Sequence, residues 1–168
     1  ASAIKATVQT VALATAIDVD VRRFLERLDA CDRHNHRAWK TCAACAERLE
    51  AAVALYHGDF LHDFYISDSA AFEEWALAWR ERLRQRLLSA LERLIERSTW
   101  RGDLSVAVAL ARRRVELDPL EEAGQRLLMF ALARNGEHTA AEAQGESLRR
   151  LLDAELGVAP DPQSEALL

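Results

Sequence analysis

The chain has 168 residues, of which 50% are hydrophobic and 29% are charged, with six glycines and three prolines. This composition predicts one compact domain and excludes a disordered chain, because the apolar residues suffice for a core. The formal net charge of −5 argues against a protein that binds nucleic acid by itself, since neutralising phosphates requires a basic surface.

The beginning of the chain lacks the features of a targeting segment. Residues 1–17 have neither the basic start nor the continuous apolar block of a secretory signal, and charges interrupt every later apolar stretch. Three cysteines cannot all pair within one chain. We therefore predict a soluble protein of the reducing cytoplasm that does not contact a membrane. Because the first residue is not Met, we also expect a fragment of a longer protein.

The N-terminal residues alternate between apolar and smaller or polar side chains, which predicts one or two short strands at residues 4–8 and 11–17. Two such strands are not stable alone, so we expect them to pack on the helices or on an element outside this chain. Asp18 or Asp20 then caps a short helix over residues 21–30.

A polar segment containing cysteine and histidine follows as an ordered loop, and a second helix runs from about residue 43 to a stop at Gly58. Ser67, Asp68 or Ser69 caps a long third helix. Its predicted buried stripe, with spacings of three and four, is Phe72, Trp75, Ala76, Trp79, Leu83, Leu87, Leu91, Leu94, Ile95 and Ser98.

The last third of the chain contains an internal repeat. Residues Gly102, Ala107, Ala109 and Leu117 recur 34 positions later as Gly136, Ala141, Ala143 and Leu151. We predict helices over 104–117, 120–134 and 139–155, the last ending before Gly157. The period is that of tetratricopeptide helix pairs, so the predicted fold is all-α, built of tetratricopeptide-like antiparallel helix pairs. Such pairs stack on their neighbours and leave a face for a partner.

Six sequence runs occur in an order and spacing that chance hardly reproduces. They are ALYHGDFL at 54–61, FEEWALAWRERL at 72–83, ALERL at 90–94, RGD at 101–103, LDPLEEA at 117–123 and ELGVAPDPQSEAL at 155–167. With these runs, residues 54–168 resemble the bacterial transcriptional activator domain of the streptomycete antibiotic regulatory protein (SARP-like) family. The run DVDVRRFLERL at 18–28 is similar to the family's entry into that domain. We accordingly divide the chain into an extension, 1–17, and this domain, 18–168, with a Cys/His loop at 31–45.

The resemblance implies a regulatory module of a transcription activator that normally follows a winged-helix DNA-binding domain, which this chain lacks. The implied partners are other domains of the same regulator, a second copy in a homodimer, or RNA polymerase, with DNA reached only through the winged helix. The alternative is a tetratricopeptide-type adaptor that binds peptides and is unrelated to transcription. Among the possible functions, an enzyme is the least favoured, because neither a catalytic signature nor a GxxxxGK[ST] loop occurs. We accordingly assign no catalytic residue and no nucleotide cofactor.

One short segment concentrates the side chains that bind zinc: Cys31, His34, His36, Cys42 and Cys45. Our hypothesis is a structural zinc held by the three cysteines and one of the two histidines. A metal in this loop would replace apolar packing that the segment lacks. The alternative is that Cys42 and Cys45 are ordinary small residues of a helix. Trp39 lies between the ligands and either covers the metal or contacts a partner.

Three further clusters favour structural interpretations. His57, Asp59, His62 and Asp63 resemble metallohydrolase ligands, but so short a match arises readily by accident. The helical spacing of Phe72, Trp75, Trp79 and Trp100 favours a core stripe over an aromatic ligand site. A stripe of arginines could contact DNA phosphates: Arg80, Arg84, Arg93, Arg97, Arg101 and residues 112–114. Glutamates are interleaved with these arginines, which favours an ordinary solvated helix surface.

Overall fold

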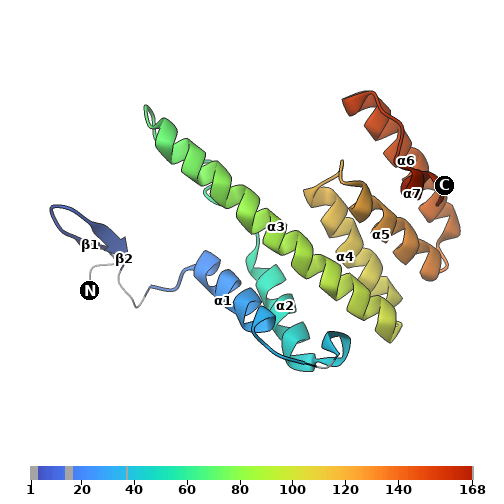
Figure 1. The fold of residues 1–168 in the computed structure, drawn as a ribbon, viewed down its shortest axis with the longest axis horizontal. Helices are drawn as coiled ribbons and strands as arrows, with labels where there is room; N and C mark the ends of the chain where they lie inside the picture. The colour runs from blue at the N-terminus through green and yellow to red at the C-terminus, as the bar shows by residue number, and fades with distance from the viewer. Residues whose placement is uncertain (1–3, 14–16, 37, 168) are drawn as a thin grey trace.

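The computed structural model describes residues 4–13, 17–36 and 38–167 (Figure 1). Two strands, β1 (Ile4–Ala6) and β2 (Val11–Leu13), precede the helices. The helices in these ranges are α1 (Asp20–Asp32), the 3-10 turn η1 (Trp39–Thr41), α2 (Ala43–Leu55), α3 (Ala70–Arg101), α4 (Leu104–Leu117), α5 (Glu122–Arg134), α6 (His138–Leu156) and α7 (Pro162–Glu165).

The helices pack in consecutive pairs along the chain. From α1 to α6 each helix packs on the next, and α7 folds back onto α5. Figure 1 shows the resulting row of helices, with the 32-residue α3 running obliquely through its middle. The predicted all-helical architecture of helix pairs is confirmed.

The core lies in connected clusters along this row. Leu28 of α1, Leu49 of α2 and Leu91 of α3 meet in the first cluster, and each is at most 3% exposed. A second cluster joins α3, α4 and α5, and there Ala107 and Ala111 of α4 are fully buried. Their small side chains let α4 approach its neighbours closely.

Glycines end the later helices where the sequence placed them. Gly102, Gly136 and Gly157 have φ of 83°, 84° and 66°, the left-handed conformation that favours glycine after a helix. The prediction that α2 runs to Gly58 is wrong. That helix ends at Leu55, because Tyr56 is extended, at φ −88° and ψ 100°, where its ring packs 6.0 Å from that of Phe24.

Two predicted helix starts also differ. The N-cap residue of α1 is Val19, because the carboxylate of Asp18 pairs with Arg23 at 2.8 Å and that of Asp20 accepts from the adjacent amide of Val21. Helix α5 starts at Glu122 and not at residue 120. The preceding Glu121 is its cap, and its carboxylate accepts a hydrogen bond from the amide of Gly124 at 3.0 Å.

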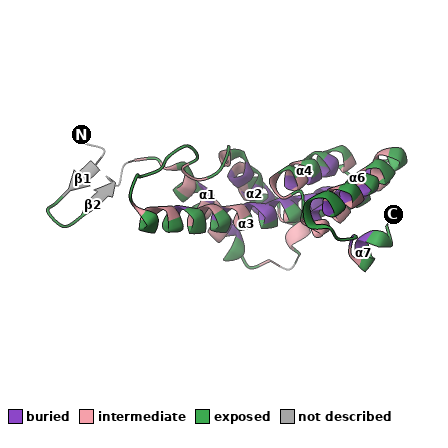
Figure 2. Ribbon diagram, turned by 90° about the horizontal axis from the view of Figure 1, so that it is seen from above, coloured by how far each residue is buried: buried purple, intermediate pink, exposed green. Residues whose placement is uncertain are grey.

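The prediction that the tryptophans of α3 all belong to the core is wrong for two of them. Trp75 is 46% exposed and Trp100 is 59% exposed. The stripe is continuously buried only from Leu83 onward, where α2 and α4 cover it, whereas the first turns of α3 project past the other helices (Figures 1 and 2). Ser69 is the N-cap residue there, although its hydroxyl makes no capping hydrogen bond.

The N-terminal strands form a short antiparallel hairpin in which Ile4 lies opposite Leu13. Its turn is closed by the amide of Thr10, which donates to the hydroxyl of Thr7 at 2.9 Å. Figure 1 draws the hairpin apart from the helices, so the described residues do not show packing on them, and packing on an element outside this chain stays a prediction. Residues 14–16 of the predicted second strand lie outside the described residues.

Candidate functional site

Three of the predicted metal ligands converge. Nδ1 of His34 lies 3.1 Å from Sγ of Cys45 and 3.5 Å from Sγ of Cys42. The three ligand atoms all lie within 4.8 Å of one another, and no other group of three or more His, Cys, Asp or Glu side chains converges in this way within the described ranges.

The secondary structure explains this convergence. Cys31 lies in the last turn of α1, and a loop carries His34 back toward α2. Cys42 is the N-cap residue of α2, and Cys45 lies in the first turn of the same helix. The two-residue spacing therefore places both sulfurs at one helix end, where the returning loop delivers the imidazole.

The other two predicted ligands lie at the edge of this group. Cys31 is 1% exposed, and its thiol donates to the carbonyl oxygen of Cys45 at 3.6 Å. His36 stacks on the ring of His34 with centroids 5.1 Å apart, and its Nδ1 lies 2.6 Å from the carbonyl oxygen of His34. Its Nε2 is buried with no hydrogen-bond partner among the described residues.

Two arginines that sequence reasoning did not connect with the cysteines point toward their sulfurs. Nη2 of Arg93 lies 3.6 Å from Sγ of Cys31, and Nη1 of Arg48 lies 3.9 Å from Sγ of Cys45. The Arg93 guanidinium also lies over the ring of Trp39, 5.3 Å from its centroid. Trp39 thus borders the cluster through Arg93. Arg93 is 62 residues from Cys31, so no local pattern could have indicated the contact.

The cysteines differ in their acidity. Burial, together with the neighbouring sulfurs of Cys31 and Cys42, raises the pKa of the Cys45 thiol to about 12. The backbone amide of Cys45, in the first turn of α2, lowers the pKa of the Cys42 thiol. Sulfur and imidazole ligands so arranged suit zinc, and four protein ligands would leave no open position for catalysis.

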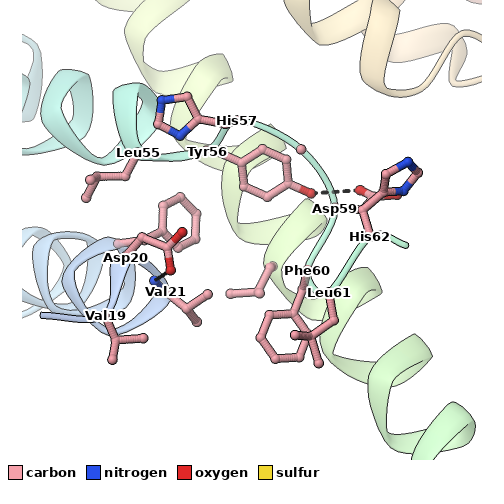
Figure 3. A pocket seen from close by; sticks show the side chains of 13 residues that line it. Val19, Asp20, Val21, Leu55, Tyr56, His57, Asp59, Phe60, Leu61 and His62 are labelled. Carbon is pink, nitrogen blue, oxygen red and sulfur yellow. Dashed lines mark hydrogen bonds between the residues drawn. The ribbon is translucent and has the colours of Figure 1, made fainter. Parts of the chain in front are cut away.

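The second histidine cluster does not gather into a site. His62 pairs with Asp63 at 3.5 Å on the surface, and Asp59 accepts a hydrogen bond from the hydroxyl of Tyr56 at 3.0 Å. In Figure 3 the rings of His57 and His62 lie on either side of Tyr56. Burial and the Asp59 carboxylate raise the pKa of Tyr56 to about 12, so it stays a neutral hydrogen-bond donor.

A cavity of about 530 Å³ opens beside these residues, between the start of α1, the loop after α2 and one turn of α3 (Figure 3). Val21 and Phe24 of α1, Phe60 and Leu61 of the loop, and Leu83 of α3 supply most of its apolar lining. Asp20, His57, Asp59 and His62 also line the cavity, so it is an apolar recess with a polar edge.

An exposed aromatic cluster adjoins this cavity, and we call it the aromatic end of α3. It consists of Phe60, Phe64, Phe72, Trp75 and Trp79, whose rings form a chain of contacts with centroids 5.5–6.4 Å apart. Two of its five rings are exposed, Phe64 (51%) and Trp75 (46%), and so are Tyr65 (76%) and Ile66 (44%), which follow Phe64 in the chain.

The predicted arginine stripe is engaged in internal contacts, and it is only in part the solvated surface that the sequence predicted, since Arg97 and Arg114 are buried. Arg84 pairs with Glu81, Arg93 with Asp32, Arg101 with Asp103, Arg112 with Glu137 and Arg114 with Glu121. Arg80, Arg97 and Arg113 donate to backbone carbonyls, those of Phe60, Lys40 and Tyr56 among them. These guanidiniums hold helices and loops together, which favours a structural role over phosphate binding.

The described helices, packed in consecutive pairs, define an all-α domain. The bacterial transcriptional activator domain family matches residues 19–168, so the chain belongs to that family. The family is regulatory and non-catalytic. Comparison with curated proteins gives no match. Within the described residues, every helix is too short or too polar to cross a membrane.

Proposed function

We propose that this chain is the protein-interaction module of a bacterial transcription activator, and that the aromatic end of α3 docks onto another domain of the same regulator. The observation that carries the proposal is that Trp75 is 46% exposed while its ring contacts those of Phe60, Phe72 and Trp79. Contiguous apolar patches on a soluble domain mark interaction sites, and tryptophan is enriched among residues that dominate binding energy.

The cavity strengthens this assignment. Phe60 belongs both to the cavity wall and to the aromatic end, so the two form one apolar surface with a recess in it. A protruding side chain of the partner would fill the recess while aromatic rings cover the surroundings, which is the usual anatomy of an interface centre.

The position of the surface favours a domain of the same regulator over the other candidate partners. Val19, which connects the hairpin to α1, lines the cavity, and the hairpin and the first turns of α3 lie at the same end of the molecule (Figure 1). A winged helix joined ahead of the hairpin, as the family resemblance implies, would therefore be tethered close to the aromatic end. Tethering raises the effective concentration of such a partner to about the millimolar range.

The test compares Trp75→Ala with a matched control, Trp100→Ala, which removes an exposed tryptophan from the opposite end of α3. In the natural regulator, we expect Trp75→Ala to lower activation of a promoter reporter several-fold while Trp100→Ala leaves it unchanged. Thermal melting of both variants must match that of the parent chain.

Three results would contradict the proposal. Equal activity of the Trp75→Ala and Trp100→Ala variants would show that the aromatic end has no special role. Sedimentation of the 168-residue chain as a dimer, lost only in Trp75→Ala, would assign the surface to a second copy instead. If the regulator with Trp75→Ala folds normally but no longer crosslinks to RNA polymerase through position 75, the surface would be assigned to the polymerase.

Family membership favours this role over the peptide-binding adaptor unrelated to transcription. We also propose that the module works in the cytoplasm, because transcription takes place there in bacteria and all three cysteines are free thiols. The division of the chain after residue 17 remains part of the same proposal.

A further inference from the structure

We propose that Cys31, His34, Cys42 and Cys45 bind one zinc ion, with His34 coordinating through Nδ1, and that the ion joins the end of α1 to the start of α2. This inference is independent of the aromatic end. It concerns the opposite side of the first core cluster, where the loop after α1 lies.

The distances suit tetrahedral coordination. Zinc–sulfur bonds of about 2.3 Å and zinc–nitrogen bonds of about 2.0–2.1 Å at tetrahedral angles separate sulfur from nitrogen by about 3.6 Å. Nδ1 of His34 lies 3.1 Å from Sγ of Cys45 and 3.5 Å from Sγ of Cys42. Small adjustments, on the order of half an ångström, would complete this part of the shell.

Cys31 is the best fourth ligand. Its side chain is buried against the first turn of α2, where its thiol reaches the carbonyl oxygen of Cys45 at 3.6 Å. His36 is less suitable because its Nδ1 faces the carbonyl oxygen of His34, and its ring is stacked on the His34 ring. We assign His36 the role of holding the His34 imidazole in position.

The surrounding charges suit a zinc centre with three thiolates. Three thiolates exceed the two positive charges of the ion, so the centre would be anionic. Guanidinium groups of Arg48 and Arg93 already lie near the sulfurs of Cys45 and Cys31. Arg93 is in turn fixed by the carboxylate of Asp32 at 3.1 Å, which makes it a positioned neighbour of the site rather than a mobile surface side chain.

A metal link would stabilise the loop between α1 and α2, which lacks buried side chains among its described residues. Between α1 and α2 no described residue is buried, although this segment must hold the two helices at their common end. A metal supplies stabilisation where an apolar core is missing. Loss of zinc should therefore loosen the loop and the α1–α2 contact before it affects α4–α6.

The experiment uses the whole 168-residue chain, purified without a tag and fully reduced. Native mass spectrometry and elemental analysis should find about one zinc per chain, and cobalt substitution should give the thiolate charge-transfer and tetrahedral ligand-field bands of a cobalt–sulfur site. The matched pair is His34→Gln and His36→Gln. We expect the first to lose zinc to a competing chelator at a concentration at least about tenfold lower than the parent chain, and the second to stay closer to the parent.

A cysteine variant provides the second measurement. Cys31→Ser should keep the fold by circular dichroism but weaken the cobalt charge-transfer band relative to the parent, because one thiolate is lost. Absence of zinc after refolding with one equivalent, an octahedral cobalt spectrum, or zinc loss in His36→Gln but not in His34→Gln would each overturn the assignment.

Discussion

The ion pair between Arg114 of α4 and Glu121 before α5 should make a measurable contribution to stability. The Arg114 side chain is 6% exposed, and its Nη1 and Nη2 both donate to the Glu121 carboxylate. The same carboxylate accepts from the amide of Gly124, so it holds the α4–α5 turn together. We choose Glu121→Gln because it keeps the shape of the side chain and removes only its charge.

The expected loss lies between two limits. Removing one partner of a fully buried ion pair costs about 3–5 kcal/mol, whereas an exposed pair contributes about 0.2–1 kcal/mol. Arg114 is buried but the side chain of Glu121 is 36% exposed, and glutamine keeps the bond to Gly124. We therefore expect a loss of about 1–2 kcal/mol, or about 2–8 °C in Tm for a domain of this size.

The pH dependence gives a second readout. Burial acts to raise the pKa of Glu121, but the Arg114 guanidinium and the Gly124 amide outweigh it and hold that pKa below the ordinary value of 4.5. A lowered pKa means that the stabilisation is complete above the unfolded value and is lost as the pH falls through the folded value. The stability of the parent chain should thus fall more steeply with acidification below about pH 5 than that of Glu121→Gln.

The assay is thermal and urea unfolding monitored by circular dichroism at several pH values. Glu146→Gln is the control, since its pair with Arg149 is an exposed contact within one helix, and we expect no measurable change in Tm. Identical melting of Glu121→Gln and the parent chain at neutral pH, or parallel pH profiles, would refute the reasoning.

A change at Gly124 tests the same contact, because Gly124 lies beside the Arg114 guanidinium. Alanine is favoured over glycine in a helix by about 1 kcal/mol. A Cβ atom at position 124, however, would overlap Nη1 of Arg114. We expect the cost of this overlap to exceed the gain in helix propensity, so Gly124→Ala should lower the free energy of unfolding. A stabilised variant would show that the guanidinium moves away without cost.

Three further predictions concern the packing of the helices. Leu91→Ala, in the centre of the first core cluster, should lower the free energy of unfolding by about 2–5 kcal/mol in urea titrations. Gly102→Ala should cost about 1 kcal/mol or more because its φ is 83°, whereas Gly58→Ala, at a position without positive φ, should be nearly neutral in the same measurement. Arg113→Met should lower Tm and speed amide exchange at the end of α2, since its guanidinium donates to the carbonyl of Tyr56 at 2.7 Å.

The sequence predicted those parts of the fold whose cause is local. The glycines at 102, 136 and 157 ended helices because a left-handed residue is a local requirement. The spacing of leucines along α3 predicted a helix and its buried side from residue 83 onward. The same spacing could not show that Trp75 is exposed, because burial there depends on whether another helix reaches the first turns of α3.

The candidate site likewise has features that the local sequence predicted and features that depend on tertiary packing. The sequence predicted that Cys31, Cys42, Cys45 and one of His34 or His36 gather. Cys42, Cys45 and His34 do so because a short loop returns to a helix start. The choice between His34 and His36 depends on ring orientation, which composition does not encode. The approach of Arg93 to Cys31 depends on how α3 packs on α1, 62 positions away along the chain.

The shared use of α3 by two core clusters has a consequence for how the domain opens. Leu91 belongs to the first cluster and Ile95, one helical turn later, to the second. The backbone hydrogen bonds in the middle of α3 can open only if both core clusters come apart. The free energy of opening there therefore approaches that of complete unfolding. At the C-terminal end, α6 packs on α5 through a small cluster around Leu148 and on the edge of the second cluster through Ala140 and Ala141. Local stability should therefore decline from the centre of α3 toward the C-terminus, which leaves the last helix pair the most readily remodelled part of the row.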